Sequence, residues 1–186
     1  TAALLAGSLR AEVTKVDITS KEDVMNAKSW GSTGPYEKLM GTVHYAVDPN
    51  NPHNKIIVDL DKAPKNAQGK VEFSADICIV RPKDPSKANG VLMLHIPNRG
   101  RGVPTTPAQY AANELTMEEG YTLVWLGWEY DIAKAAGLIL LDAPIATDNG
   151  KTINGWIDPG PWFIPDKRED SVNWATGYNT PAYLPL

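Results

Sequence analysis

The residues best suited to chemistry lie in one short loop, Pro97-Asn-Arg-Gly-Arg-Gly-Val-Pro-Thr105. Its glycines, Gly100 and Gly102, allow backbone N–H groups to turn toward a ligand, and the predicted helix behind the loop begins with unpaired N–H donors. Such donors stabilise the negative oxygen of a tetrahedral intermediate, and losing one costs about 3–4 kcal/mol of transition-state energy. The structural alternative is that both glycines only let the chain bend into the helix.

Other reactive side chains lack the companions that catalysis requires. His95 ends the strand before this loop, where a hydrogen-bonded core histidine is the simpler interpretation. Ser74 and Cys78 share one face of a predicted strand without a paired base, so neither is an activated nucleophile. We expect no metal ion and no cofactor, because the remaining candidates favour turns or lack ligand spacing: His44, His53, Asp59-Leu-Asp61 and Asp148-Asn-Gly150.

The elements that must hold the loop are two buried-type strands and a helix. Val91–Ile96 is nearly continuously apolar, which is typical of a strand buried on both faces, and residues 121–128 form a second such stretch. Between them, a helix is predicted with Thr106 as its N-cap, Pro107 as its first residue and Gln109 completing a capping box. Its apolar stripe consists of Ala108, Ala111, Ala112 and Leu115, and Gly120 stops it. This order predicts a βαβ unit with parallel strands over residues 91–128, and therefore an α/β fold.

The flanking regions differ from this unit. Residues 12–82 are predicted to be β-rich and antiparallel, with strands near 12–18, 41–48, 56–60 and 71–82. Residues 129–186 are predicted to be a loop-rich insertion and an irregular C-terminal tail, with short strands near 138–144 and 152–156. Trp128, at the end of the second buried strand, is a candidate to line a pocket for an apolar acyl group.

Composition excludes several classes of function. The chain has 186 residues, 42% of them hydrophobic, and a formal net charge of -4. Its scattered Lys and Arg argue against a nucleic-acid partner, and no apolar run approaches the roughly 20 residues needed to cross a bilayer. Residues 1–11 are apolar and then small, as in the tail of a signal peptide, or they form an ordinary N-terminal helix. The first alternative predicts a secreted or periplasmic protein.

Several stretches together resemble a family of large bacterial α/β-hydrolase-domain proteins. They are residues 34–49, 57–67 and 71–76, Pro97-Asn-Arg-Gly100, and Gly120-Tyr-Thr-Leu-Val-Trp-Leu-Gly-Trp128. The resemblance implies that residues 12–186 are the N-terminal portion of an α/β-hydrolase domain. It also implies a serine carboxylesterase that works through an acyl-serine intermediate on a small-molecule ester. In that role the backbone of Arg99 and Gly100 forms the oxyanion hole, Asn98 and Arg101 position the loop or the substrate, and Trp128 lines the pocket.

The nucleophile of such an enzyme is missing from this stretch. Its serine lies in a Gly-x-Ser-x-Gly elbow, and the nearest string, Gly31-Ser-Thr-Gly34, has the wrong spacing. Because the triad order in this fold is Ser, then acid, then His, all three members are expected after residue 186, in the remainder of the hydrolase chain. The alternative is a non-catalytic β-rich binding or assembly module with Trp30, Trp156 and Trp162 as contacts. The sequence predicts neither the particular ester nor the oligomeric state.

Overall fold

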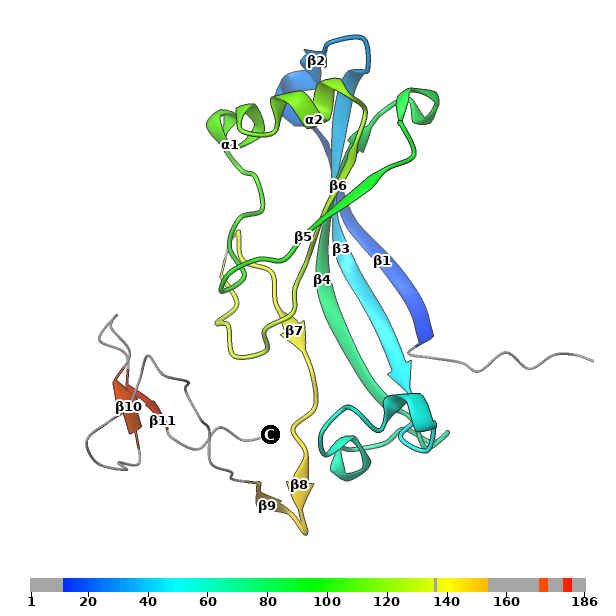
Figure 1. The fold of residues 1–186 in the computed structure, drawn as a ribbon, viewed down its shortest axis with the longest axis vertical. Coiled ribbons are helices and arrows are strands. Elements are labelled where there is room, and N and C mark those ends of the chain that lie inside the picture. The colour runs from blue at the N-terminus through cyan, green and yellow to red at the C-terminus, as the bar shows by residue number, and fades with distance from the viewer. Residues whose placement is uncertain (1–11, 136, 154–170, 174–178, 182–186) are drawn as a thin grey trace, which may run out of the picture. The chain divides into compact units, whose positions relative to one another are not determined.

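The computed structural model describes residues 12–135, 137–153, 171–173 and 179–181 (Figure 1). The chain divides into two compact units, one formed within residues 11–46 and 72–143 and the other within residues 47–71 and 144–186. The predicted signal peptide or N-terminal helix of residues 1–11 lies outside the described residues, as do Trp156 and Trp162.

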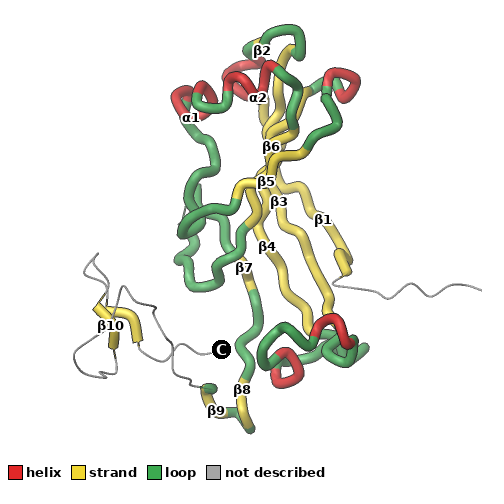
Figure 2. The backbone as a smooth tube through the Cα atoms, in the orientation of Figure 1, coloured by secondary structure: helices red, strands yellow, loops and turns green. Residues whose placement is uncertain are grey.

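A seven-stranded sheet organises the first unit (Figures 1 and 2). Five strands form the order β1–β3–β4–β6–β5, while β2 pairs with β3 and β7 pairs with β4. Their bounds are β1 Glu12–Asp23, β2 Ser29–Trp30, β3 Gly34–Val47, β4 Val71–Pro82, β5 Leu92–His95, β6 Thr122–Leu126 and β7 Leu141–Asp142. Two short helices, α1 (Pro107–Ala111) and α2 (Glu114–Glu118), lie between β5 and β6 in the chain.

The predicted α/β fold class is wrong, because the protein is mainly β. β5 and β6 pair in parallel, with Leu92 opposite Thr122 and His95 opposite Trp125. The pairs β1–β3, β4–β6 and β4–β7 are antiparallel, however, so the sheet is mixed. The helical part consists of two helices of five residues each and short 3-10 turns. A parallel pair inside an otherwise antiparallel sheet does not make the layered α/β architecture that residues 91–128 suggested.

The helix predicted after Thr106 is broken in two at Asn113. The side-chain Nδ2 of Asn113 donates to the carbonyl of Gln109 at 2.9 Å, a local bond that competes with regular helix hydrogen bonding. The start agrees with the sequence, since Thr106 N–H donates to Oε1 of Gln109 at 3.0 Å. The predicted apolar stripe is wrong: Tyr110 and Met117 are buried, whereas the stripe residues are exposed, namely Ala108, Ala111, Ala112 and Leu115.

One face of the sheet carries the core of the first unit. Cys78 lies opposite Trp125 and Val80 opposite Leu123, so these four side chains share a face. They are buried together with Tyr110 and Met117 from the helices and with further members Val24, Trp30, Tyr36, Val103 and Ile139. The hydroxyl of Tyr36 reaches the carbonyl of Met117 at 2.8 Å, which fastens β3 to the helical segment. The helices therefore cover this face by two large side chains rather than by a continuous stripe.

Two predictions about apolar strands also fail. The segment Val91–Ile96 is not buried on both faces, because β5 is an edge strand and Val91, Leu92, Leu94 and Ile96 are exposed. Residues 56–60 do not form a strand, and they lie in turns that lead into a 3-10 helix at Leu60–Lys62. Short apolar runs do not distinguish these outcomes, because the neighbours that would bury them are set by the tertiary fold.

The second unit has a smaller core. Ala63, Val71 and Ala146 are buried together, with Leu60 and Ile153 packed against them. Its short strands form two antiparallel pairs: β8 (Thr147–Asp148) with β9 (Lys151–Thr152), and β10 (Ser171–Asn173) with β11 (Asn179–Pro181). The first pair closes at Asn149 and Gly150, both at positive φ, as the sequence Asp-Asn-Gly predicts for a turn.

Candidate functional site

The loop after β5 forms a tight reverse turn. Arg101 N–H donates to the carbonyl of Asn98 at 3.2 Å, and the two residues form an antiparallel bridge. Both central residues have positive φ, 53° at Arg99 and 70° at Gly100. Positive φ at both central residues is the pattern of a type I′ turn. Arginine rarely adopts this left-handed conformation, so its presence at position 99 is unusual.

Gly100 is required by close packing as well as by its φ. A Cβ at this position would lie 2.5 Å from the carbonyl oxygen of Ile139 and 2.9 Å from Cδ1 of Ile132. The Gly100 carbonyl accepts a hydrogen bond from Ile139 N–H at 3.0 Å. Gly100 is therefore buried under the segment that follows β6, while Gly102 has open space around its Cα. The glycines therefore allow the chain to turn here, as expected. An oxyanion-binding role for the backbone of Arg99 and Gly100 stays a prediction.

The side chain of Arg99 is held by two carboxylates from the segment after β6. Its Nη1 donates to Oδ1 and Oδ2 of Asp131 at 2.9 and 3.0 Å, and Oε2 of Glu129 lies 3.9 Å away. Arg99 and Asp131 are exposed, so this pair contributes at most about 1 kcal/mol to stability. Its structural effect is to fix where the loop lies relative to the end of β6.

The other predicted site residues lie around the same turn. Trp128 donates from Nε1 to the carbonyl of Pro97, so it is bound to the loop although its ring is half exposed. Asn98 and Arg101 are exposed on the turn itself. The structure thus brings all five predicted residues to the carboxyl ends of the parallel strands β5 and β6, which is where ligands gather in parallel sheets.

Two buried polar atoms near these strand ends have no hydrogen-bond partner within the described part of the chain. They are Nε2 of His95, the last residue of β5, and Oε2 of Glu129, three residues after β6. The His95 ring lies against Trp125 with centroids 4.5 Å apart and planes 8° from parallel. Burial lowers the pKa of His95, so the imidazole is neutral at pH 7. Oε2 of Glu129 still forms an ion pair with Arg99 at 3.9 Å, so Nε2 of His95 is the one of the two atoms with neither a hydrogen bond nor an ion pair in the described residues, which is unusual for a buried polar atom.

The residues that sequence reasoning missed here are Glu129 and Asp131. Their position was available from the sequence, because both follow the buried stretch 121–128 at the end that faces the loop. Their pairing with Arg99 was not, since it joins residues 32 apart in the chain.

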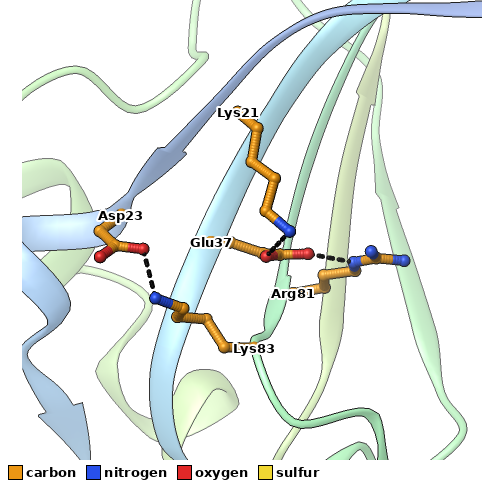
Figure 3. A network of polar contacts seen from close by, with 5 residues as sticks. All are labelled: Lys21, Asp23, Glu37, Arg81 and Lys83. Carbon is orange, nitrogen blue, oxygen red and sulfur yellow. Dashed lines mark hydrogen bonds and ion pairs between the residues drawn. The ribbon is translucent and has the colours of Figure 1, made fainter.

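A second polar network lies on β1, β3 and β4 (Figure 3). The carboxylate of Glu37 accepts from Arg81 Nε at 2.8 Å and pairs with Lys21 Nζ at 2.6 Å. The Glu37 side chain is only 3% exposed. Burial alone would raise the pKa of Glu37, but the bonds from Lys21 and Arg81 hold it below its usual value. Because each of the three residues comes from a different strand, the network joins β1, β3 and β4, and nothing about it indicates catalysis.

Several functional interpretations find no support in the described residues. There, no group of three or more His, Cys, Asp or Glu side chains could hold a metal ion. No helix in the described ranges is long and apolar enough to cross a membrane. Trp30, expected as an exposed contact of a binding module, is 1% exposed and belongs to the core.

Comparison of the chain with protein-family models, curated proteins and solved structures found no match.

Proposed function

We propose that this chain supplies an oxyanion-binding loop and part of a substrate pocket to a serine ester hydrolase. The acyl-serine intermediate would form on a serine outside residues 1–186. The observation that carries the proposal is the grouping at the carboxyl ends of β5 and β6. A glycine turn, an anchored Arg99, the half-exposed Trp128 and the buried, unpaired Nε2 of His95 all lie at these ends.

In this proposal the backbone performs the chemistry of the turn. The N–H groups at Arg99 and Gly100 donate to the oxygen of a tetrahedral intermediate, and fixed donors of this kind each contribute about 3–4 kcal/mol to the transition state. The Arg99–Asp131 pair and the Trp128–Pro97 bond hold the turn in place beforehand, so little reorganisation is needed during reaction. Asn98 and Arg101, both exposed, are available to contact the ester.

The first test is covalent labelling with a fluorophosphonate probe. The whole polypeptide that carries this chain should be labelled, with the adduct on a serine outside residues 1–186, whereas the 186-residue chain should remain unlabelled. A labelled serine within the 186-residue chain would contradict the proposed division of roles. An unlabelled and inactive whole polypeptide would contradict the hydrolase itself.

The second test separates the turn from the rest of the loop. In the whole polypeptide, Gly100→Ala should lower kcat on short p-nitrophenyl esters by about 100-fold, because the added Cβ displaces the turn and its donors. Gly90→Ala is the matched control, since Gly90 has a similar φ of 80° with nothing within 4 Å of an added Cβ. Thermal midpoints confirm that both variants are folded during the assay. Equal kcat values for the two variants would show that the backbone of the turn does not contribute to catalysis.

A second candidate function, an assembly module, is favoured by the face of the sheet opposite the core. Leu92 and Leu94 pair with Thr122 and Val124, and Val124 pairs with Ile79. At the other edge Val13 and Val16 pair with Tyr45 and Val43, and Tyr45 stacks on Phe73, which shares the face of Ile79. Both edges therefore expose apolar side chains on one face: Val13, Val16 and Ile18 on β1, and Leu92 and Leu94 on β5.

Such a face is normally covered by protein. If assembly is the function, the purified 186-residue chain should be folded and should bind another polypeptide through this face, and Leu92→Ser with Leu94→Ser should abolish that binding. It should also show no esterase activity in any polypeptide that contains it. Esterase activity that depends on Gly100 would favour the hydrolase.

A further inference from the structure

Three consecutive apolar side chains project into solvent from a turn in the second unit. Ile56 is 86% exposed, Ile57 45% and Val58 67%. They are neighbours in the chain, and the residues on both sides of them are polar, Lys55 and Asp59. An exposed apolar group of this kind is unusual on a soluble surface and marks a site of interaction.

Hydrogen bonds hold the turn on its N-terminal side. Asn54 is buried and donates from Nδ2 to the carbonyl of Asp48 at 2.9 Å. The Asn54 carbonyl accepts from Ile57 N–H at 3.0 Å. The backbone of the apolar residues is therefore fixed to a buried anchor.

The turn is also fixed on its C-terminal side. Asp59 adopts a left-handed conformation with φ 54° and pairs with Lys62 at 2.8 Å. Leu60, the next residue, packs against the small core of Ala63, Val71 and Ala146. Anchored at both ends, the chain keeps Ile56, Ile57 and Val58 outside that core.

The charge around the turn is more positive than that of the chain. Residues 48–70 contain four lysines (55, 62, 65 and 70) and three aspartates (48, 59 and 61), a net charge of +1, against -4 for the whole chain. Lys55, next to Ile56, and Lys65, seven residues after Val58, are both exposed, and Lys65 Nζ donates to the Asp61 carbonyl. Long lysine side chains beside apolar groups suit a boundary between acyl chains and phosphate headgroups.

We propose that Ile56, Ile57 and Val58 insert into the surface of a phospholipid bilayer, with Lys55 and Lys65 directed to the phosphates. Three successive residues of a turn direct their side chains to different sides. A protein groove accommodates one side of a segment, whereas the acyl-chain region accepts apolar groups in any direction. The depth required is only that of a few side chains, so no membrane-spanning element is involved.

The experiment is flotation of the 186-residue chain with vesicles of phosphatidylcholine alone and of phosphatidylcholine with phosphatidylglycerol. The native chain should float with both, and more strongly with the anionic vesicles. Ile56→Ser with Val58→Ser should lower the partition coefficient at least about tenfold on both. Lys55→Gln with Lys65→Gln should reduce the preference for anionic vesicles only.

The matched control removes two other exposed apolar side chains, Val13 at 54% and Val16 at 50% exposure, by Val13→Ser with Val16→Ser, and should leave flotation unchanged. Equal losses in the loop and control variants would show adhesion by any exposed apolar surface and would overturn the proposal. Absence of flotation of the native chain with either kind of vesicle would also overturn the proposal. This holds even if the turn is then found to bind a protein. Thermal midpoints of all variants exclude unfolding as a cause of altered flotation.

Discussion

The imidazole of His95 lies flat against the indole of Trp125, with ring centroids 4.5 Å apart, at the point where two parallel strands end. Residues opposite one another in these strands share a face, so the stack follows from the register of β5 and β6. The same stack places Nε2 of His95 among buried atoms without a partner in the described structure. The arrangement favours the neutral imidazole, and this has a measurable effect on stability.

We expect the chain to lose stability as the pH falls below about 6.5, the ordinary pKa of histidine. Burial lowers the pKa of His95 in the folded state, so between that value and 6.5 the unfolded chain binds more protons, and the free energy of unfolding rises with pH. His95→Phe keeps a ring on Trp125 without a titrating group and should flatten this part of the profile. Urea unfolding at a series of pH values measures the effect. An NMR titration of His95 at or above pH 6.5 would contradict it.

Glu37→Gln should lower the free energy of unfolding by about 1–3 kcal/mol, because the hydrogen bonds from Lys21 and Arg81 lose their charged acceptor. The half-exposed pair Asp23–Lys83 provides the control: Lys83→Met should change stability by less than about 1 kcal/mol. Denaturant titration at pH 7 compares the two.

The Glu37 network should also respond to acid. Its pKa is held below the usual value in the folded state, so its stabilisation is present above the unfolded pKa of about 4.3 and is lost as the pH falls through the folded value. The native protein should therefore lose more stability on acidification in this range than Glu37→Gln does. Parallel profiles for the two proteins would show that Glu37 does not titrate in this way.

Cys78 should be inert in the folded protein. It is fully buried, and burial raises the pKa of its thiol to about 12, so almost no thiolate is present at pH 8. We expect Ellman's reagent to react with it only in denaturant, with one thiol released per chain. Rapid reaction in native buffer would show that the core face around Trp125 opens.

Gly100→Ala should destabilise the chain by more than about 2 kcal/mol, since it combines a left-handed backbone with a Cβ 2.5 Å from the Ile139 carbonyl oxygen. Gly90→Ala incurs the backbone strain alone and should cost about 1–2 kcal/mol. Thermal denaturation distinguishes them. Equal losses would mean that the segment around Ile139 moves away from the turn at little cost.

The sequence predicted those strands whose signal is local. The alternation of Val71–Pro82 and the apolar stretch around Trp125 both became strands, because each carries its pattern within a few residues. Leu92 and Leu94 gave the same apolar signal, yet they lie at an edge. Sheet order, which depends on pairing between distant segments, decides whether such a strand is buried, and no local pattern encodes it.

The candidate site was predictable to a similar extent. Glycines and a following helix start marked the turn at Arg99 and Gly100, since both signals are short-range. The carboxylate of Asp131 reaches Arg99 only when β5 and β6 pair, and the break at Asn113 depends on a side-chain bond that periodicity does not report. The exposed positions of Ile56, Ile57 and Val58 were missed for a related reason: an apolar run signals a strand whether or not its neighbours bury it.

The position of β6 between β4 and β5 has a consequence for biosynthesis. Leu92–His95 leaves the ribosome before Thr122–Leu126, the only described strand with which it pairs. Until β6 has left the ribosome, the backbone of β5 has no described partner strand, while β1, β3 and β4 can already assemble. The nascent chain therefore passes through a stage at which this segment is a target for chaperones, and slowing elongation between His95 and Leu126 should prolong that stage.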